Sequence, residues 1–490
     1  MPYLLALDQG TTSSRSILFD QTGKLVGMAQ QEFPQYFQQV GWVEHDAMEI
    51  WHSQLSTIHQ VLQNTGIKPN QVAAIGITNQ RETTIVWDKK TGIPICPAIV
   101  WQDKRTHAYC QTLKEQGHAK TIQEKTGLVI DPYFSASKLA WILQHIPQAK
   151  ARAIAGELAF GTVDTWLAFQ LSEQALHVTD SSNASRTMLF NIHTAQWDED
   201  LLDLFDIPRA LLPTVYPSSY YFGYATILGQ KIPIAGIAGD QQAALFGQAC
   251  FHQGMAKNTY GTGCFLLQNT GETCSKSQHG LISTLACQTQ EQPQYALEGS
   301  VFIGGAVVQW LRDNLGLIQQ SKDIETLAQS VPDSDGVIFI PAFAGLGAPY
   351  WDANAKGAIL GLHRGTKSAH IARAALEAIA YQSTELLLAM QNDASKPITE
   401  LRVDGGAACN NFLLQFQANL LGIPVIRPQC LETTALGVAY LAGLQVGLFE
   451  NTDTISHLWR EEKRFVPQIP RQQASTLLEQ WRNAVARLIA

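Results

Sequence analysis

One stretch near the start of the chain decides the fold: Leu4-Leu-Ala-Leu-Asp-Gln-Gly-Thr-Thr-Ser-Ser-Arg-Ser-Ile-Leu-Phe-Asp20. Its apolar run from Leu4 to Leu7 is typical of a buried strand. The tripeptide that starts at Gly10 is typical of a tight turn, and the run from Ser16 to Phe19 is typical of a returning strand. The stretch therefore predicts a β-hairpin with a polar tip.

The tip of this hairpin has the chemistry of a phosphate site. Gly10 has no Cβ, so the backbone can come close to a ligand. Arg15 adds a permanent charge suited to phosphate, and Asp8 can hold Mg²⁺, which prefers one or two carboxylates plus phosphate oxygens. Three neighbouring residues can surround a phosphate oxygen with hydroxyl groups: Thr11, Thr12 and Ser13. An ordinary hairpin with a polar tip is the alternative, and this stretch alone leaves both open.

A second copy of the pattern favours the phosphate site. It reads Lys257-Asn-Thr-Tyr-Gly-Thr-Gly-Cys-Phe-Leu-Leu-Gln268, and its turn begins about half a chain length after the first. A chain of 490 residues is also too long for a single hydrophobic core. We therefore expect an α/β protein of two similar halves, with domains at 1–248 and 249–490.

The composition excludes some classes of partner. The formal net charge is −8 and no run of Lys or Arg occurs, so neither nucleic acid nor an anionic membrane surface is an expected partner. Charged residues make up only 16% of the chain, below the usual quarter, which indicates large buried cores.

The cysteines and the apolar runs indicate a cellular location. None of the eight cysteines forms a C-x-x-C pair, so we expect buried, reduced thiols rather than a zinc or redox motif. The N-terminus shows no signal region, and no apolar run approaches the ~18 residues of a membrane span. We expect a soluble cytoplasmic protein.

A third glycine turn, Gly405-Gly406, follows the short strand 401–403 and precedes a helix. Glycine turns at strand ends leave backbone N–H groups free to bind anions, and a helix N-terminus favours phosphate. The turn lacks both the Walker A pattern and G-x-G-x-x-G. Three such turns in two halves are best explained by one nucleotide held between them, and three unrelated loops are the alternative.

Asp240 is the candidate general base. It follows a strand at 232–239, where a substrate hydroxyl could approach and give up its proton during phosphoryl transfer. Asp240 also precedes a short helix that ends at Gly247, so an N-cap is an equally good interpretation. Sequence spacing does not separate the two.

Arg81 and Glu82 form a charged pair on a loop between two apolar strands. A carboxylate can accept from two hydroxyls and a guanidinium can donate to a third, which suits a neutral polyol. Considered alone, a surface ion pair is the more common meaning of such a pair. Three aromatic residues near strand ends could form apolar walls, although such residues usually belong to the core: Trp101, Tyr133 and Phe265.

Two further local predictions concern polar segments. Asp46 is expected to cap a helix, with Glu49 completing a capping box. Residues 179–220 are rich in turn formers with apolar residues interleaved, so we expect a surface insertion there rather than a flexible linker.

Several of these motifs together resemble the glycerol kinases, a branch of the FGGY carbohydrate kinase family in the actin/Hsp70/sugar-kinase superfamily. The similarity runs from about residue 3 to beyond 450, and 133–141 and 357–377 resemble the two signatures of the wider family. The stretches that carry it are Leu7 to Arg15, Trp42-Val-Glu-His-Asp46, Ile77-Thr-Asn-Gln-Arg-Glu-Thr-Thr84, Gly239-Asp-Gln-Gln242 and Tyr260-Gly-Thr-Gly-Cys264.

The resemblance implies two ribonuclease-H-like domains around a central cleft, and Mg-ATP-dependent phosphorylation of glycerol to sn-glycerol 3-phosphate with Asp240 as base. It implies a polyol site made of Arg81, Glu82, Trp101, Tyr133, Asp240, Gln241 and Phe265. It implies phosphate contacts from Thr11, Thr12, Ser13 and Arg15, with Asp8 at the metal. The remaining nucleotide contacts it implies are Thr262, Gly305, Gln309, Gly406 and Asn410. We also expect a homo-oligomer, either dimer or tetramer.

Two departures from the family pattern concern regulation. Some bacterial members bind fructose 1,6-bisphosphate through an arginine in a glycine-rich loop, but here the matching stretch 226–232 is shortened and carries Lys231. Others carry a phosphorylated histidine where this chain has tyrosines, at 218–224. We expect neither form of regulation.

Two rival functions stay open at this point. One is a kinase of the same family that acts on a pentulose or another polyol. The other is a nucleotide-switched interaction protein, as in the chaperone and filament members of the superfamily, which binds ATP in the same cleft without a polyol pocket.

Overall fold

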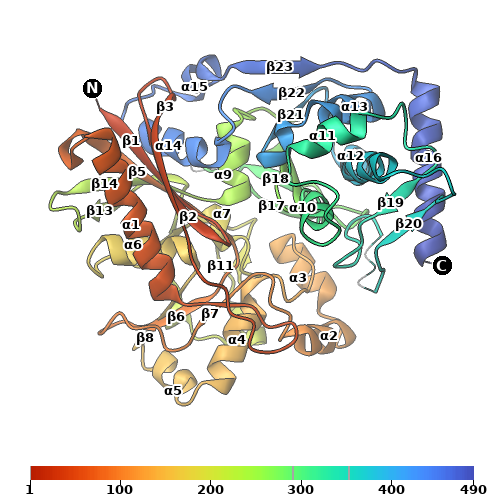
Figure 1. Ribbon diagram of the computed structural model, residues 1–490. Helices are drawn as coiled ribbons and strands as arrows, with labels where there is room; N and C mark the ends of the chain where they lie inside the picture. The colour runs from red at the N-terminus through yellow and green to blue at the C-terminus, as the bar shows by residue number, and fades with distance from the viewer. Residues whose placement is uncertain (1, 290–291, 351, 353, 490) are drawn as a thin grey trace.

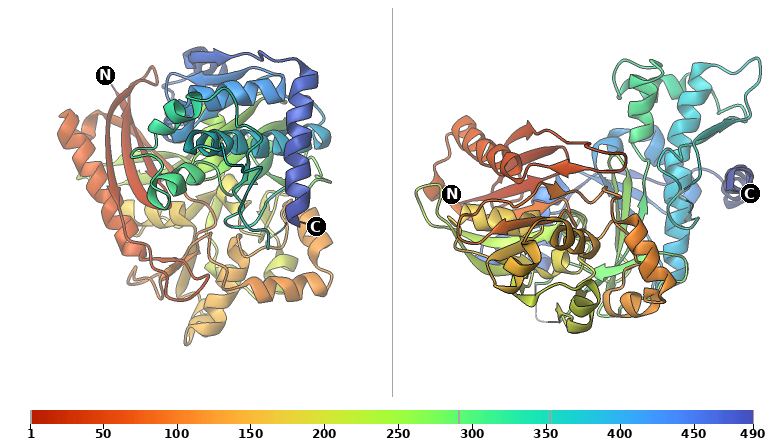
Figure 2. Two further views of the ribbon diagram at one scale, coloured as in Figure 1. Left: turned by 45° about the vertical axis from the view of Figure 1, so that its right-hand side comes forward. Right: turned by 90° about the horizontal axis from the view of Figure 1, so that it is seen from below.

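Two mixed β-sheets form the centre of the computed structural model, which describes residues 2–289, 292–350, 352 and 354–489. Figure 1 shows the first sheet in the N-terminal half and the second in the C-terminal half, and the views of Figure 2 place the two chain ends on opposite sides of the molecule. The first sheet has the order β13-β14-β5-β1-β2-β3. Its strands are β1 (Tyr3–Gln9), β2 (Ser13–Phe19), β3 (Leu25–Glu32), β5 (Val72–Asn79), β13 (Ser219–Ala225) and β14 (Ile232–Gly239).

The second sheet has the order β17-β18-β16-β15-β21-β22-β23. Its strands are β15 (Ala256–Tyr260), β16 (Cys264–Gly271), β17 (Ile282–Leu285), β18 (Tyr295–Val301), β21 (Leu401–Asp404), β22 (Val425–Pro428) and β23 (Glu461–Phe465).

The two sheets share one plan of strand directions. In the first, β1 is antiparallel to β2 and parallel to β5, and β5 is parallel to β14. In the second, β15 is antiparallel to β16 and parallel to β21, and β21 is parallel to β22. Both predicted hairpins are therefore present, and the expectation of an α/β protein with two similar halves is confirmed. The border after residue 248 stays a prediction.

Alternating side chains of β1 bury both faces of the first sheet. Leu5 and Leu7 belong to a core with α1 (Ala47–Thr65) and α6 (Val163–Leu171). Leu4 and Ala6 belong to another core with α14 (Thr433–Gln445). This is the expected result of the two-residue period of a strand. Helix α14 thus belongs to the last part of the chain but packs on the first sheet, as Figure 1 also shows.

Helix α1 has the predicted cap but not the capping box. The carboxylate of Asp46 accepts a hydrogen bond of 2.7 Å from the backbone N–H of Met48. Glu49 instead accepts from the hydroxyl of Tyr36 at 2.9 Å, and Tyr36 lies on the other side of the short strand β4 (Glu44–His45) in the chain.

A middle region of small sheets and helices lies between β5 and β13. Its first elements are β6 (Ile85–Asp88) and β7 (Ala98–Ile99). Strand β7 pairs with β4 (Glu44–His45), which, like η1 (Pro69–Gln71), precedes β5 in the chain. The next are α2 (His107–Glu115), α3 (Ala119–Thr126), α4 (Ser135–His145), α5 (Ala149–Ile154) and β8 (Leu158–Gly161). The last are β9 (Val178–Asp180), α7 (Ser181–Ala184), β10 (Phe190–Asn191), β11 (Gln196–Trp197), α8 (Glu199–Phe205), η2 (Arg209–Leu211) and β12 (Thr214–Tyr216).

The prediction of a surface insertion at 179–220 is wrong for its first part. Asp180, Asn183 and Arg186 are fully buried. The turn formers can lie inside because they satisfy one another: the Asp180 carboxylate accepts from the backbone N–H groups of Ser182 and Asn183, each at 2.9 Å. The segment therefore forms part of the interior beside β14.

The remaining helices and small strands belong to the second half, apart from α9, which follows β14. Helices α12 and α13 pack on the second sheet around the largest core cluster. No helix among the described residues is long and apolar enough to cross a membrane. The elements are α9 (Asp240–Gly247), α10 (Ala306–Asp313), α11 (Asp323–Gln329), β19 (Ile338–Ile340), β20 (Ala358–Leu360), α12 (Ser368–Asp393), η3 (Gly406–Cys409), α13 (Asn411–Leu421), α15 (Thr452–Leu458) and α16 (Arg471–Ile489).

Candidate active site

The turn between β1 and β2 is closed by its own backbone. The N–H of Gly10 donates to the carbonyl of Ser13 at 2.9 Å. The indole N–H of Trp101 donates to the hydroxyl of Thr11 at 2.9 Å, while Thr12 is exposed at the tip. The turn therefore leaves Thr12 exposed and is tied to the loop that carries Trp101.

Three charged side chains lie in a row beside this turn. Asp8, which is 3% exposed, pairs with Arg15. A second nitrogen of Arg15 pairs with Glu432 at 2.7 Å. Burial raises the pKa of Glu432, while Arg15 opposes that rise. Because Glu432 directly precedes α14, the row joins the first hairpin to the last part of the chain.

The second turn, between β15 and β16, supports the start of α10. The N–H of Gly304 donates to the carbonyl of Thr262, and that of Gly305 to the carbonyl of Gly261, each at 2.8 Å. A Cβ on Gly305 would lie 2.7 Å from the Gly261 oxygen, so only glycine fits there. Gln309 is exposed one turn into the helix.

The third turn lies at the same sheet edge as the second. Thr259 of β15 pairs with Asp404 of β21, so the parallel strands end together. Gly405 has φ +86°, and a Cβ there would approach the Tyr260 carbonyl to 2.6 Å. Gly406 has open space in front of it, and the side chain of Asn410 caps α13 by accepting from the N–H of Leu413 at 2.9 Å.

Arg81 and Glu82 are interior residues, so the alternative of a surface ion pair is wrong. Arg81 is 3% exposed and Glu82 is 1% exposed, and the closest nitrogen and oxygen of the two are 3.9 Å apart. Each has a nearer partner: Arg81 reaches Glu298 at 2.6 Å, and Glu82 accepts from Arg186 at 2.6 Å. The backbone of Glu82 has φ +63°, which turns the loop sharply between β5 and β6.

Asp240 is the first residue of α9 and not its N-cap, which is Gly239. Its carboxylate accepts from the adjacent N–H of Gln241 at 2.8 Å and pairs with Arg81 at 3.1 Å. The side chain is 32% exposed, so one part of the carboxylate faces outward. Burial raises the pKa of Asp240, while Arg81 and Lys257 act to lower it.

Gln241 is held from the second half of the chain. Lys257 of β15 is fully buried, and its ammonium donates to the Gln241 side-chain oxygen at 2.6 Å and to the hydroxyl of Thr259 at 2.8 Å. Burial lowers the pKa of Lys257 to about 8, although Asp404 and Asp240 oppose the shift.

The three predicted aromatic walls are all partly buried. Trp101 and Tyr133 meet edge to face, with ring centroids 5.5 Å apart. The backbone carbonyl of Phe265 accepts from Lys257 at 3.3 Å. Because Lys257 also donates to Gln241, the backbone of Phe265 lies near Gln241. The hydroxyl of Tyr133 accepts from Arg81 at 3.5 Å. Contacts between side chains thus bring Arg81, Asp240 and Tyr133 together.

Sequence reasoning missed three charged residues beneath this group: Arg186, Lys257 and Glu298. A usable signal was present for the last two, because each is a single charge within a strand whose side chains are otherwise mostly buried. Arg186 carried no such signal, since it lies in the polar segment that was predicted to be on the surface.

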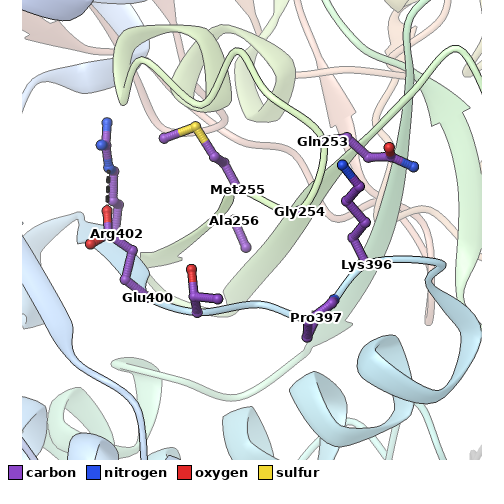
Figure 3. A pocket seen from close by; sticks show the side chains of 9 residues that line it. Gln253, Gly254, Met255, Ala256, Lys396, Pro397, Glu400 and Arg402 are labelled. Atoms are coloured by element: carbon purple, nitrogen blue, oxygen red, sulfur yellow. Dashed lines mark hydrogen bonds and ion pairs between the residues drawn. The ribbon is translucent and has the colours of Figure 1, made fainter.

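A separate cavity of about 390 Å³ lies at the other end of β15, away from the turns. Figure 3 shows its side chains, with Lys396 and Gln253 on one side and Arg402 on the other. None of the predicted site residues lines it. Its lining consists of Gln253, Gly254, Met255, Ala256, Lys396, Pro397, Thr399, Glu400 and Arg402.

Comparisons with known proteins cover both halves. The model for the N-terminal domain of the FGGY family of carbohydrate kinases matches residues 3–247. The model for the C-terminal domain of the same family matches residues 256–446.

Relatives match along the full length. The glycerol kinase of Acidovorax sp. strain JS42 is 61% identical and covers 100% of this chain and 99% of its own. The glycerol kinase of Deinococcus radiodurans is 59% identical, and the match covers 99% of this chain and 97% of that protein. The crystal structure of Plasmodium falciparum glycerol kinase with ADP has a TM-score of 0.92 at 35% identity, with coverage of 100% and 99%. The chain belongs to the FGGY family of carbohydrate kinases.

Proposed function

We infer that the protein transfers the γ-phosphoryl group of ATP to glycerol and so forms sn-glycerol 3-phosphate. The observation that carries this function is identity of about 60% to glycerol kinases over the whole chain. The ADP-bound relative with the same fold supports ATP as the donor. The reaction belongs to glycerol catabolism.

Within this function, we assign glycerol to the space beside Arg81 and Asp240. Buried charged groups with fixed partners can discriminate a hydroxyl from its absence, because a missing hydroxyl would leave them unpaired. The arrangement in which Arg81 contacts Asp240, Tyr133 and Glu298 supports this assignment. The residues that we assign to glycerol are Arg81, Glu82, Tyr133, Asp240 and Gln241, with Trp101 and Phe265 against its carbons.

Asp240 is assigned the role of general base. Its partly exposed carboxylate can accept the proton of the attacking hydroxyl as the phosphoryl group moves in line from ATP. Burial raises its pKa, which makes the carboxylate a better proton acceptor. Arg81 at 3.1 Å holds it in place and keeps it ionised.

The nucleotide is assigned to the three glycine turns. The first turn addresses the phosphates through Thr11, Thr12, Ser13 and Arg15. The open space in front of Gly406, shortly before α13, supports a nucleotide at this turn, since backbone N–H groups of glycine turns bind anions. The residues that we assign to the rest of the nucleotide are Thr262, Gly305, Gln309, Gly406 and Asn410.

Asp8 is assigned to Mg²⁺. Its hard carboxylate oxygens suit this ion, which takes one or two carboxylates and completes its shell with phosphate oxygens and water. Among the described residues no group of three or more His, Cys, Asp or Glu could hold a metal by itself, which fits an ion brought by the nucleotide. When bound, Mg²⁺ neutralises charge on the transferring phosphoryl group. Arg15, which already pairs with Asp8, holds the carboxylate in position.

The same proposal includes location and assembly. All eight cysteines lie among the described residues and are free thiols, as is usual in a reducing compartment, so we assign the protein to the cytoplasm. We further propose two domains, 1–248 and 249–490, and a homo-oligomer in solution.

ADP release from Mg-ATP tests the function. Glycerol, xylulose, ribulose, gluconate and erythritol are offered separately, and a reaction without acceptor gives the basal rate. Fast turnover with glycerol alone is the expected result. Preference for a pentulose would change the assigned substrate and leave the family assignment in place. A xylulose kinase has the same fold, with a TM-score of 0.88 at 25% identity. No stimulation by any acceptor would contradict the kinase assignment.

A further inference from the structure

Four buried charges form a closed network beneath the proposed glycerol site. Glu298 accepts from Arg81 at 2.6 and 2.9 Å, through both of its oxygens. It also accepts from Arg186 at 3.1 Å, and Arg186 in turn donates to Glu82 at 2.6 Å. All four residues are at most 3% exposed. Two arginines and two carboxylates thus balance each other in the interior.

The network joins the two halves of the molecule. Arg81, Glu82 and Arg186 come from the first half, on the loop after β5 and on the segment after α7. Glu298 lies in β18 of the second sheet. Glu298 is therefore the residue through which the second half holds both arginines of the first.

Ionisation of Glu298 is strongly favoured by this arrangement. Although burial acts to raise the pKa of Glu298, Arg186 and Arg81 lower it to about 2. Removing one member of a buried charged set leaves its partner uncompensated, which is far more costly than losing an exposed pair. If Glu298 lost its charge, the nearest carboxylate to Arg81 would be that of Asp240, at 3.1 Å. Arg81 would then be attracted toward the proposed base.

We propose that Glu298 and Arg186 are positioning residues for glycerol, which hold Arg81 and Glu82 in their binding positions and complete the polyol pocket only when the two halves meet. The inference rests on the proposed function. It adds two residues that do not touch the substrate in this assignment but act through Arg81 and Glu82. Glu298 in particular makes glycerol affinity depend on contact between the halves.

The test compares Glu298→Gln with the wild-type protein. The substitution keeps the shape and removes the charge, so the KM for glycerol should rise by about 10- to 100-fold, as expected for loss of hydrogen bonds to a charged group. The KM for ATP should change by less than about threefold, because the hydrogen bonds and ion pairs of the Glu298 side chain among the described residues go to Arg81 and Arg186 and not to the glycine turns. A general loss of structure would raise the KM for glycerol and the KM for ATP together. A rise in the KM for glycerol alone therefore identifies a positioning role.

A matched control is Glu377→Gln, which removes another buried carboxylate paired with an arginine, Arg373, at 2.9 Å. It should leave the KM for glycerol unchanged. Arg186→Gln should reproduce the split of Glu298→Gln, and the double variant should lose less than the product of the two single losses, since both disturb one network. If the rise in glycerol KM in the double variant equalled the product of the two single rises, the two residues would act independently and the shared network would be overturned.

The outcomes separate this inference from the proposed function. If the wild-type protein does not phosphorylate glycerol, the function itself fails. If it does, and Glu298→Gln keeps a glycerol KM within twofold of the wild-type value, the positioning role is overturned. Should Glu298→Gln fail to fold, Glu298→Asp retains the charge but withdraws the carboxylate by one methylene. That variant should show the same split with a smaller rise, and an unchanged glycerol KM in it would equally overturn the role.

Discussion

Asp240 is the residue at which sequence and structure can be compared most directly. Its sequence position allowed two roles, a general base or a helix N-cap. The structure gives the N-cap position to Gly239 and directs the Asp240 carboxylate toward Arg81. The Asp240 carboxylate still accepts from the N–H of Gln241 at the start of α9. An Asn side chain keeps an oxygen that can accept this bond, so the role as base can be tested with the helix start preserved.

Asp240→Asn should retain the fold and ATP binding and lose most turnover. An amide of the same size cannot accept the hydroxyl proton, and removal of a general base costs about 100- to 10,000-fold in rate. The measurement is kcat with glycerol, beside the thermal unfolding midpoint and nucleotide affinity. Asp203→Asn, at an exposed position of α8, is the control. Near-normal kcat in Asp240→Asn would remove the residue as base.

His45 makes stability depend on pH. Its ring is fully buried, and within the described part of the chain neither ring nitrogen has a hydrogen-bond partner. Burial lowers its pKa from 6.5 to about 4. Between these values the unfolded chain binds a proton that the folded protein does not, so this contribution to stability is present above pH 6.5 and is lost as the pH falls toward 4.

The expected loss is roughly 3 kcal/mol by pH 4, at 1.36 kcal/mol for each pKa unit. Thermal unfolding between pH 7 and 4.5 measures it, with His45→Gln compared with the wild-type protein at each pH. The stability difference between the two should shift steadily in favour of the variant as the pH falls. The exposed His52→Gln on α1 should give a much flatter difference, and an equal slope in both would contradict the role of His45.

The individual site residues differ in how far the sequence could predict them. Arg81, Glu82 and Asp240 were found because they lie where strands end, and the structure brings Arg81 into contact with Asp240. Arg186 was not found because it lies in a segment that was predicted to be on the surface. The single charge of Glu298 in a mostly buried strand was a usable signal, but it did not identify the partners of Glu298, which are distant in sequence. Glu298 lies 217 positions from Arg81, which no local pattern can connect.

At the scale of elements, local patterns predicted what local forces determine. Both hairpins and the short helix at 240–247 were predicted and are present. The surface position predicted for 179–220 was wrong for its first part, because the turn formers there bond to each other inside the protein. The placement of α14 on the first sheet could not be derived either, since an apolar helix indicates burial but not the surface that covers it.

Helix α14 approaches its neighbours through glycines. A Cβ on Gly437 would lie 1.9 Å from the Ala243 carbonyl of α9, and one on Gly76 of β5 would lie 2.3 Å from the Val438 carbonyl. In both places the nearest atom belongs to the backbone, so no side chain could move aside to make room for an added methyl group. The position of α14 also sets that of Glu432, the partner of Arg15, so this packing reaches the proposed phosphate site.

Gly437→Ala should therefore destabilise the protein by about 3 kcal/mol or more, the upper range for overpacking a core. Thermal unfolding gives the effect as a lower midpoint. Gln445→Ala, at an exposed position of the same helix, should leave the midpoint nearly unchanged. If Gly437→Ala were as stable as that control, the close approach of α14 to α9 would not exist in solution.

At the scale of the whole molecule, our site assignments put the substrates between two halves that share one plan of strands. Each half begins with a hairpin whose turn we assign to phosphate, and the contacts of Lys257 with Gln241 and of Arg81 with Glu298 join the halves below the proposed glycerol site. This arrangement explains why neither half would be complete as a kinase. It also predicts how the protein should respond to its substrates.

Glycerol together with a non-hydrolysable ATP analogue and Mg²⁺ should draw the halves together, because a closed cleft excludes the water that would otherwise accept the phosphoryl group. Small-angle X-ray scattering should show a smaller radius of gyration with these ligands than without them, in an assembly of chains that would each measure about 23 Å when compact. Asp240→Asn should still close at saturating glycerol, since an amide of the same size can keep a hydrogen bond to the glycerol hydroxyl and loses only the ability to take its proton. Closure without glycerol, driven only by the nucleotide or by another protein, would instead favour the switch-protein function, whose ligand cleft needs no polyol.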